Sequence, residues 1–253
     1  MSVSLESIEG GIAILKIDRP QVRNALDWDA MYTFRDCIES AHSMSDLRAF
    51  IVSGSNETFI AGGDLKALHR FTSEEDGVRL SREMTLTLEM LEALPCPTIA
   101  AINGPARGGG AEICLACDLR IISTNADIGF VQIKLGLVPG WGAGQRLLHL
   151  VGYSLALEWL STGRILSAEE ALAFGLVNTL TPPGQALSTA IDLAQQVASN
   201  PAPAVRAIKR ILRAGVYLPP STAASYEGAE FPPLWAAEEH IQAVQRFLDN
   251  KTQ

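Results

Sequence analysis

Two glycine-rich segments are the places where this chain could do chemistry. Residues 59–65 read Phe-Ile-Ala-Gly-Gly-Asp-Leu, and residues 103–112 read Asn-Gly-Pro-Ala-Arg-Gly-Gly-Gly-Ala-Glu. Each follows an apolar stretch that predicts a strand, and glycine lets a ligand approach the main chain closely. The second segment also begins a predicted helix, whose first N–H groups have no partner within the helix and could bind a developing oxyanion. A tight turn with close helix–strand packing would give the same pattern, so spacing alone leaves both interpretations open.

Glu112 is the acidic residue just inside this predicted helix. It is followed by Ile113, Leu115 and Ala116, so its carboxylate stands in an apolar stretch. Burying a carboxylate there is costly unless the group is paired or functional. Glu112 could satisfy the positive end of the helix dipole, or it could act as a general acid or base whose pKa is tuned by burial. The pattern alone leaves these two roles open.

The motifs of several common functional classes are missing. Gly140, Gly142 and Gly144 are followed by Gln145, so they do not complete the pattern of a dinucleotide-binding loop. The sequence has no phosphate-binding loop with a lysine and no nucleophile elbow of a serine hydrolase. Metal-ligand spacing is not found among Cys37, Cys96, Cys114, Cys117, His42, His69, His149 and His240. We therefore expect no metal site, and we expect the cysteines to be reduced and buried.

The composition predicts a folded chain with a large core. The chain has 253 residues, of which 47% are hydrophobic and 19% charged, and this argues against disorder. One large α/β domain, with or without an appendage, needs no disulfide or metal at this length. The net charge of −8 disfavours nucleic acid or an anionic membrane as a partner. With no membrane-spanning apolar stretch and no basic signal-peptide start, we expect a cytoplasmic protein.

Strand, glycine loop and helix recur along much of the chain. The patterns predict a hairpin over residues 3–17, strands at 50–53, 98–102, 119–123 and 128–130, and helices at 28–41, 73–94, 109–117 and from 145 onward. This alternation favours a stacked parallel α/β architecture with function on the loops. From about Pro183 the pattern is nearly all helical, which predicts a helical C-terminal module.

Five segments in register resemble the crotonase (enoyl-CoA hydratase/isomerase) superfamily. They are Arg19-Pro20 with Asn24-Ala25-Leu26; Phe59 to Leu65; Asn103 to Glu112 with Cys117-Asp118; Leu135 to Gly140 with Gln145-Arg146-Leu147; and Ala171 to Val177. Each match is weak alone, but together they extend over nearly the whole chain and make the resemblance specific. It implies an α/β fold, a crotonase-like spiral of ββα turns with a helical C-terminal trimerisation module.

The resemblance also implies how the chain is divided and what it binds. Residues 1–184 would form the spiral core that binds CoA and the acyl group, and residues 185–253 the helical oligomerisation module of a homotrimer or hexamer. The substrate would be an acyl-CoA thioester of the kind met in fatty acid metabolism. No cofactor is implied beyond the coenzyme A that the substrate carries, and no metal, nucleic acid or membrane.

Residue by residue, the resemblance assigns roles at the two glycine segments. Gly63 and Gly109 would supply the two main-chain N–H groups that hold the thioester oxygen, and Glu112 would move a proton at the reacting carbon. The set implied for CoA binding is Arg23, Ala25, Ala61, Asp64, Leu65 and Lys66. Within this set, Arg23 and Lys66 would contact CoA phosphates and the others would line the adenine pocket.

Two positions depart from the hydratase pattern. Hydratases of the superfamily use a second glutamate, and the matching position holds Gln132, 20 residues after Glu112. A carboxamide cannot usefully accept a proton near neutral pH, although it can hydrogen-bond a water or a carbonyl. Trp141 stands where many hydratases have a small residue, so it would either crowd the acyl pocket or pack under its loop. Residues 109–118, 130–131 and 139–142 resemble the ethylmalonyl-CoA decarboxylase branch, which also lacks the second glutamate.

The sequence therefore leaves more than one function open. The first is an enzyme of enoyl-CoA hydratase/isomerase type, a carbon–oxygen lyase or isomerase that stabilises a thioester enolate, with Glu112 as acid or base and Gln132 replacing the second glutamate. The alternative is a decarboxylase of methylmalonyl- or ethylmalonyl-CoA, because loss of carbon dioxide needs no base. A non-catalytic CoA-ligand or scaffold protein is a second alternative, against which the retained Glu112 and the negative charge both count.

Overall fold

The computed structural model describes residues 2–250 and begins with the predicted hairpin. β1 (Val3–Ile8) pairs antiparallel with β2 (Ile12–Ile17). The turn between them contains Gly10 and Gly11, whose φ angles of 86° and 72° lie in the left-handed region that glycine adopts without strain. The glycine pair therefore sets the point at which the chain reverses.

A six-stranded sheet in the order β1-β2-β3-β4-β6-β9 forms the centre of the fold. Its further strands are β3 (Ala49–Gly54), β4 (Thr98–Ile102), β6 (Leu119–Ser123) and β9 (Thr179–Thr181). The strands from β2 to β9 are parallel to their neighbours, and β1 is antiparallel to β2. Every residue of β3 and β4 is buried, as expected for parallel strands that are covered on both faces.

The two glycine segments follow neighbouring strands. The register pairs Phe50 of β3 with Thr98 of β4 and Ser53 with Ala101, so both strands end at the same edge of the sheet. Just beyond, the Gly54 N–H donates to Oδ1 of Asn103 at 3.3 Å. The parallel pairing of β3 with β4 thus starts both segments side by side, at the edge where open α/β sheets bind ligands.

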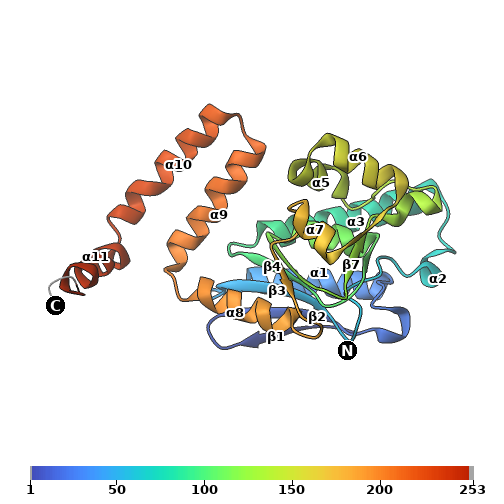
Figure 1. Cartoon of the computed structure of the whole chain (residues 1–253), viewed down its shortest axis with the longest axis horizontal. Helices are drawn as coiled ribbons and strands as arrows, with labels where there is room; N and C mark the ends of the chain where they lie inside the picture. Colours follow the sequence, from blue (N-terminus) through green and yellow to red (C-terminus); the bar gives the residue numbers. More distant parts are fainter. Residues whose placement is uncertain (1, 251–253) are drawn as a thin grey trace.

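Helices cover both faces of this sheet (Figure 1). α8 (Ala186–Ala198) packs on the face that contains Ile51 and Ile99. α1 (Trp28–His42) and α3 (Glu74–Ala93) contribute to the larger core, which includes Phe50 of β3. Successive side chains of a strand point to opposite faces, and this alternation divides the apolar residues of β3 between the two cores.

A small second sheet and several short helices complete the core. The sheet has the order β5-β7-β8, with β5 (Ala106–Arg107), β7 (Asp127–Gly129) and β8 (Ile165–Ser167). The helices are η1 (Pro20–Val22), α2 (Leu65–Leu68), α4 (Gly109–Ala116), η2 (Val131–Leu135), α5 (Ala143–Val151), α6 (Tyr153–Thr162) and α7 (Ala168–Ala173). Arg107 binds Asp127 through two hydrogen bonds of 2.6 and 2.7 Å, which joins β5 to β7 directly before α4 begins.

Three C-terminal helices project from the core (Figure 1). They are α9 (Ala202–Tyr217), α10 (Pro220–Trp235) and α11 (Glu238–Asn250). The Lys209 ammonium of α9 donates to Asp118 at 2.7 Å and to the Cys96 carbonyl at 2.8 Å, so α9 is tethered to the core. α8, the first helix after residue 184, packs on the sheet, and α9 begins beyond it. The division of the chain into two parts after residue 184 stays a prediction.

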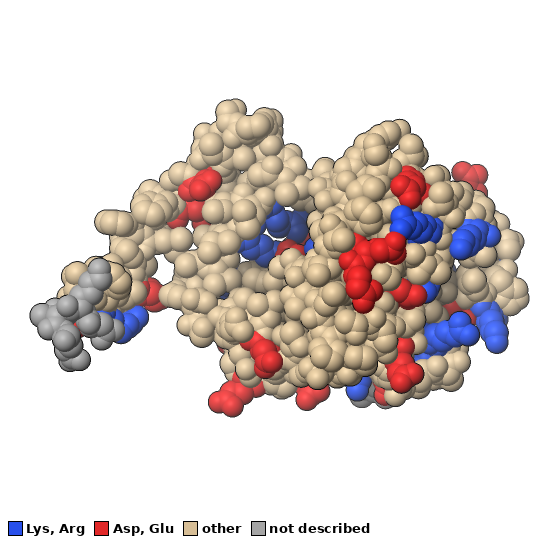
Figure 2. Space-filling model, in the orientation of Figure 1, with Lys and Arg blue, Asp and Glu red and all other residues tan. Residues whose placement is uncertain are grey.

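A hollow of about 530 Å³ lies between α9 and the core, with charged side chains at its base (Figure 2). Three of its cations face carboxylates: Arg146 and Arg213 both face Glu92, at 2.6 and 3.7 Å, and Lys209 faces Asp118. Arg120, which also lines the hollow, donates to main-chain carbonyls, including those of Leu176 and Cys117. These four cations are therefore already bound within the protein.

The sequence predicts most of these elements correctly. The mixed α/β class, the hairpin, the parallel strands and the helical C-terminal part are confirmed, with element ends that differ by a few residues. The cysteines are free thiols; Cys96, Cys114 and Cys117 are buried as expected, and Cys37 is half-buried. Within residues 2–250, no helix has both the length and the apolar character needed to cross a bilayer.

Candidate active site

The two glycine segments meet beside the start of α4. The Arg107 N–H donates to the Ile60 carbonyl at 3.0 Å, so the loop after β3 and the loop after β4 are bonded to each other. Gly62 has a φ of 90° and lies so close to α4 that a Cβ built there would stand 2.9 Å from the Gly109 nitrogen. The structure therefore brings the main chain at Gly62 and Gly63 against the first residue of α4.

Two main-chain N–H groups at this junction have no acceptor in the part of the chain that the structure describes. Within residues 2–250, neither the Gly63 nor the Gly109 amide donates a hydrogen bond, whereas the flanking Asp64 and Gly108 amides donate to Leu26 and Gly129. Gly109 is the first residue of α4, where an N–H has no partner within the helix. Both groups are therefore available to an acceptor from outside the described chain.

Glycine is required where α4 begins because its neighbours are so close. A Cβ on Gly110 would lie 1.8 Å from the Ile60 carbonyl oxygen, and a Cβ on Gly109 would lie 2.1 Å from the Trp141 ring. The first turn of α4 is thus packed between the loop after β3 and the Trp141 indole, which is 5% exposed. This geometry accounts for the run of glycines structurally and leaves the Gly109 N–H free.

The Glu112 side chain is buried, with 2% of its surface exposed, and its carboxylate accepts four N–H groups. Oε1 accepts from Gln132 Nε2 at 2.8 Å and from the Gly140 amide at 3.3 Å. Oε2 accepts from the Trp141 amide at 2.8 Å and from the Ala143 amide at 3.1 Å. Ala143 is the first residue of α5, whose N-cap is a glycine without a side chain. An acid of α4 therefore caps α5.

Burial raises the pKa of Glu112 above its ordinary value, against the opposing effect of these donors. The loss of water around the carboxylate is the largest influence, and the hydrogen bonds from Ala143, Trp141, Gln132 and Gly140 lower the pKa again. The group therefore holds a proton more readily than a glutamate in water does, which suits an acid or base that works near neutral pH.

The loop that carries Trp141 is fixed from both sides. Ser81 Oγ of α3 donates to the Gly140 carbonyl at 2.6 Å, and Arg146 of α5 donates to the Trp141 carbonyl at 2.6 Å. Sequence reasoning missed Ser81 and Arg146 in this role, and no local signal identifies them, because each acts on a backbone carbonyl brought close by the fold. The Trp141 indole is held over Gly109 as a result.

Gln132 lies in η2 and points at Glu112. Its Nε2 occupies one acceptor position of the carboxylate, and its Oε1 is buried without a hydrogen-bond partner among residues 2–250. A Cβ built on Gly108 would lie 4.0 Å from Nε2, so the carboxamide borders the loop that leads into α4. The structure thus assembles Gly63, Gly109, Glu112, Gln132 and Trp141, which lie apart in the sequence.

The residues implied for CoA binding flank this site in two short groups. The first group is held through its main-chain atoms: the Ala61 N–H donates to the Arg23 carbonyl at 3.1 Å, and the Ala25 carbonyl accepts from the Arg19 guanidinium at 2.5 Å. Asn24 belongs to the first matching segment of the sequence but received no role there. It is fully buried, and its side chain joins this group to the loop after β3.

The second group surrounds α2. Asp64 is 8% exposed and caps α2, accepting from the Lys66 and Ala67 amides at 3.1 and 3.3 Å. Leu65 and Lys66 are exposed, and so is Arg23 of the first group. In the described part of the chain, the charged ends of Arg23 and Lys66 have no hydrogen-bond partner, so both are open to an anionic ligand.

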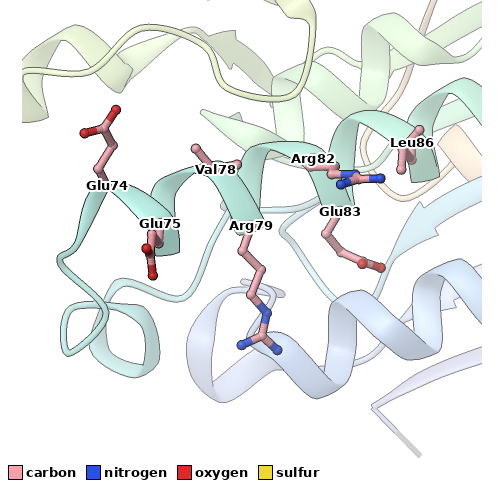
Figure 3. A pocket seen from close by; sticks show the side chains of 7 residues that line it. All are labelled: Glu74, Glu75, Val78, Arg79, Arg82, Glu83 and Leu86. Carbon is pink, nitrogen blue, oxygen red and sulfur yellow. The ribbon is translucent and has the colours of Figure 1, made fainter.

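A second hollow, of about 520 Å³, runs along the exposed side of α3 (Figure 3). It is lined by Glu74, Glu75, Val78, Arg79, Arg82, Glu83 and Leu86. Arg79 turns away toward α1, where it donates to Tyr32 and lies 4.2 Å from the Trp28 ring. Val78 and Leu86 leave apolar surface on the helix whose Ser81 holds the Trp141 loop.

Comparisons with known proteins agree with this geometry. Residues 7–253 match the family model described as enoyl-CoA hydratase/isomerase. A short-chain-enoyl-CoA hydratase of Clostridium acetobutylicum is 34% identical, over 96% of this chain and 93% of its own length. An ethylmalonyl-CoA decarboxylase of Xenopus laevis is 33% identical, over 99% of this chain and 84% of its own length. The crystal structure of an enoyl-CoA hydratase from Bacillus anthracis superposes with a TM-score of 0.94 at 31% identity, over 99% of this chain and 97% of that one.

The contact between Gly109 and Trp141 predicts a non-additive pair of substitutions. Gly109→Ala should destabilise the chain by about 2 kcal/mol, because its new Cβ meets the indole. In a Trp141→Ala background most of that cost should disappear, and urea unfolding of the four proteins measures the difference. Equal costs of Gly109→Ala in both backgrounds would contradict the contact.

The four donors on Glu112 predict a large structural role for its carboxylate. Glu112→Ala should lower the free energy of unfolding by about 3 kcal/mol, because buried N–H groups lose their acceptor. The matched control is Glu169→Ala, which removes an exposed acid from the first turn of α7 and should cost less than about 1 kcal/mol. Urea unfolding measures both, and similar losses would mean that the bonds to Glu112 add little.

Proposed function

The chain belongs to the enoyl-CoA hydratase/isomerase family, and from that premise we propose that it transforms an acyl-CoA thioester through an enolate. The observation that carries the proposal is the pair of unpartnered amides at Gly63 and Gly109, on loops that touch at Gly62. When the thioester becomes an enolate, negative charge develops on its carbonyl oxygen. Two fixed donors stabilise that charge, and losing one typically costs about 10²–10³-fold in rate.

Glu112 is the group that moves the proton in this proposal. It lies one helical turn after Gly109, so its carboxyl group and the Gly109 amide belong to the same short helix. Burial raises its pKa, which makes it a more effective acid near neutral pH. The proposed reaction is then the removal or return of a proton at a carbon near the thioester carbonyl, whose oxygen would be held at the start of α4.

Hydration by two carboxylates is not what this site supports. Gln132 stands beside Glu112, and its carboxamide can orient a water but cannot take a proton from it. Chemistry that needs one acid or base remains, such as double-bond isomerisation or a hydration in which Glu112 acts alone. Enoyl-CoA chemistry of hydratase or isomerase type, a carbon–oxygen lyase or isomerase activity, is therefore our first proposal.

Decarboxylation of a methylmalonyl- or ethylmalonyl-type thioester is the second candidate. It needs the two amides and a proton donor but no base. When carbon dioxide leaves, the electron pair of the broken carbon–carbon bond stays with the thioester and forms the enolate, which then takes up a proton. Trp141 over Gly109 narrows the space beside the thioester, and several relatives are ethylmalonyl-CoA decarboxylases. A third possibility, CoA binding without catalysis, has no observation in its favour.

The coenzyme A part of the substrate would lie along the two groups that flank the site. Main chain at Ala25, Ala61 and Leu65 would meet the adenine, Asp64 would keep α2 in place, and the free cations of Arg23 and Lys66 would meet phosphates. The apolar side of α3 could receive the acyl chain. We propose no further cofactor, and a cytoplasmic location stays a prediction.

Substrate turnover discriminates the candidates. We expect purified protein to convert 3-enoyl-CoA or a malonyl-type thioester faster than it hydrates crotonyl-CoA, as product masses would show. Glu112→Gln should slow conversion by about 10²–10⁴-fold, and Gln132→Glu should raise crotonyl-CoA hydration by restoring a second carboxylate. Rapid crotonyl-CoA hydration by the wild type would contradict our interpretation of Gln132, and no turnover with any of these thioesters would favour the scaffold.

The C-terminal helices predict self-association as a trimer or hexamer. They expose large apolar side chains, including Phe231 and Trp235, each 61% exposed, on helices with little contact to the core. Phe231→Glu should therefore dissociate the assembly, measured as mass by sedimentation, because a charge is costly inside an apolar interface. Val78→Glu is the matched control at 61% exposure on α3. A monomeric wild type would contradict the prediction.

A further inference from the structure

The Glu112 carboxylate has no acceptor position to spare. Its two oxygens offer about four such positions, and four N–H groups occupy them. In this arrangement it can neither take a proton nor carry one, because a bound proton would point at an N–H donor. Proton transfer at Glu112 therefore requires one of the four donors to withdraw.

Three of the donors are held by the main chain. The Ala143 amide begins α5, and the Trp141 N–H shares its peptide group with the Gly140 carbonyl, which Ser81 holds. The Gly140 N–H belongs to the adjacent peptide group of the same loop. Withdrawing any of them would shift the loop or the start of a helix. The fourth donor is the terminal amide of Gln132, which can turn about its last side-chain torsion, a rotation with broad, two-fold preferences.

The other end of that amide does not hold it against such a turn. Gln132 Oε1 is buried without a hydrogen-bond partner among the described residues, so the turn breaks no hydrogen bond at that end. A half-turn exchanges Oε1 with Nε2 and places the oxygen against Glu112. There it would accept the hydrogen bond that a protonated carboxyl group has to donate, while Nε2 turns toward the place that Oε1 leaves.

We propose that Gln132 is a positioning residue that frees Glu112 Oε1 for proton transfer by turning its carboxamide. Nε2 donates to the ionised carboxylate, and Oε1 accepts from the protonated carboxyl group. Oε1 of Glu112 is then the oxygen that carries the proton, which comes from the substrate carbon or from solvent, and Oε2 stays bonded to α5. This inference rests on the proposed function for its purpose, and it explains why a carboxamide suits the site: an ionised glutamate could only accept.

Two arginines on the elements that pack against α4 are paired with other acids. Arg146 of α5 binds Glu92 of α3 at 2.6 Å, and Arg107 of β5 binds Asp127. β4 contains no charged residue. The proton on Glu112 is therefore governed by burial and by N–H donors, and of these donors only Gln132 is a side chain.

The test measures the titration of Glu112 in the substrate-free full chain. Infrared difference spectra over a pH series give the band of the protonated carboxyl group, which is identified by its loss in Glu112→Gln. Gln132→Met keeps a side chain of similar length without the amide. If Gln132 bonds both the ionised and the protonated form of Glu112, the variant loses one bond from each form, so the pKa of Glu112 should move by less than about half a unit. The band of the protonated carboxyl group should change frequency, because its O–H loses the Gln132 acceptor.

The opposite result overturns the proposal. If Gln132 only donates to the ionised carboxylate, Gln132→Met should raise the pKa of Glu112 by about 1–2 units, because only the charged form loses a bond. The band of the protonated group would then keep its frequency. Substrate turnover does not enter this measurement, so the proposed function and this inference can fail separately.

A second measurement uses the wild-type side chain, so a folding defect in the variant cannot hide the answer. The side-chain amide of Gln132 is observed by NMR in protein labelled with ¹⁵N-glutamine, and its signals are identified by their loss in Gln132→Asn. If the carboxamide turns, both of its amide protons change environment as Glu112 titrates. A shift confined to the proton that faces the carboxylate, or no shift at all, overturns the proposal.

Discussion

The Glu112 carboxylate is the interaction on which the site depends. One buried acid of α4 accepts the amides that begin α5, the amide of Trp141 and the side chain of Gln132. A buried charge is tolerated only when donors replace the water it has lost, and here the donors come from η2 and from residues 140–143. The bonds that keep the carboxylate in place therefore also hold these two segments beside α4.

Close approach of the main chain is the second constraint. The loop after β3 touches α4 at Ile60 and Gly62, and the Trp141 ring covers Gly109. These contacts leave no space for a Cβ, so packing accounts for the glycines. Of the two explanations that the sequence left open, close packing is confirmed and oxyanion binding stays a prediction. The Gly63 and Gly109 amides that this prediction needs have no acceptor among residues 2–250.

The remaining polar groups hold the site indirectly. Asn24 joins the segment after β2 to the loop after β3, and Ser81 donates to the Gly140 carbonyl. Arg146 connects the Trp141 carbonyl to Glu92. Each bond links residues that are between 5 and 59 positions apart. Because buried polar groups are costly when unpaired, these bonds favour one arrangement of the loops over others.

The sequence by itself determined the elements, since helix and strand periodicity and the capping residue Asp27 are local signals, and its motifs identified Gly63, Gly109 and Glu112 as one candidate site. Its resemblance to the superfamily predicts that Gln132 stands in place of a second glutamate. Only the tertiary structure decided that Glu112 caps α5, that Trp141 lies on Gly109, and that Gln132 Oε1 has no partner among residues 2–250. Each of these facts concerns residues that are far apart in the sequence. No local pattern contains them, because they depend on how β3, β4 and α5 pack together.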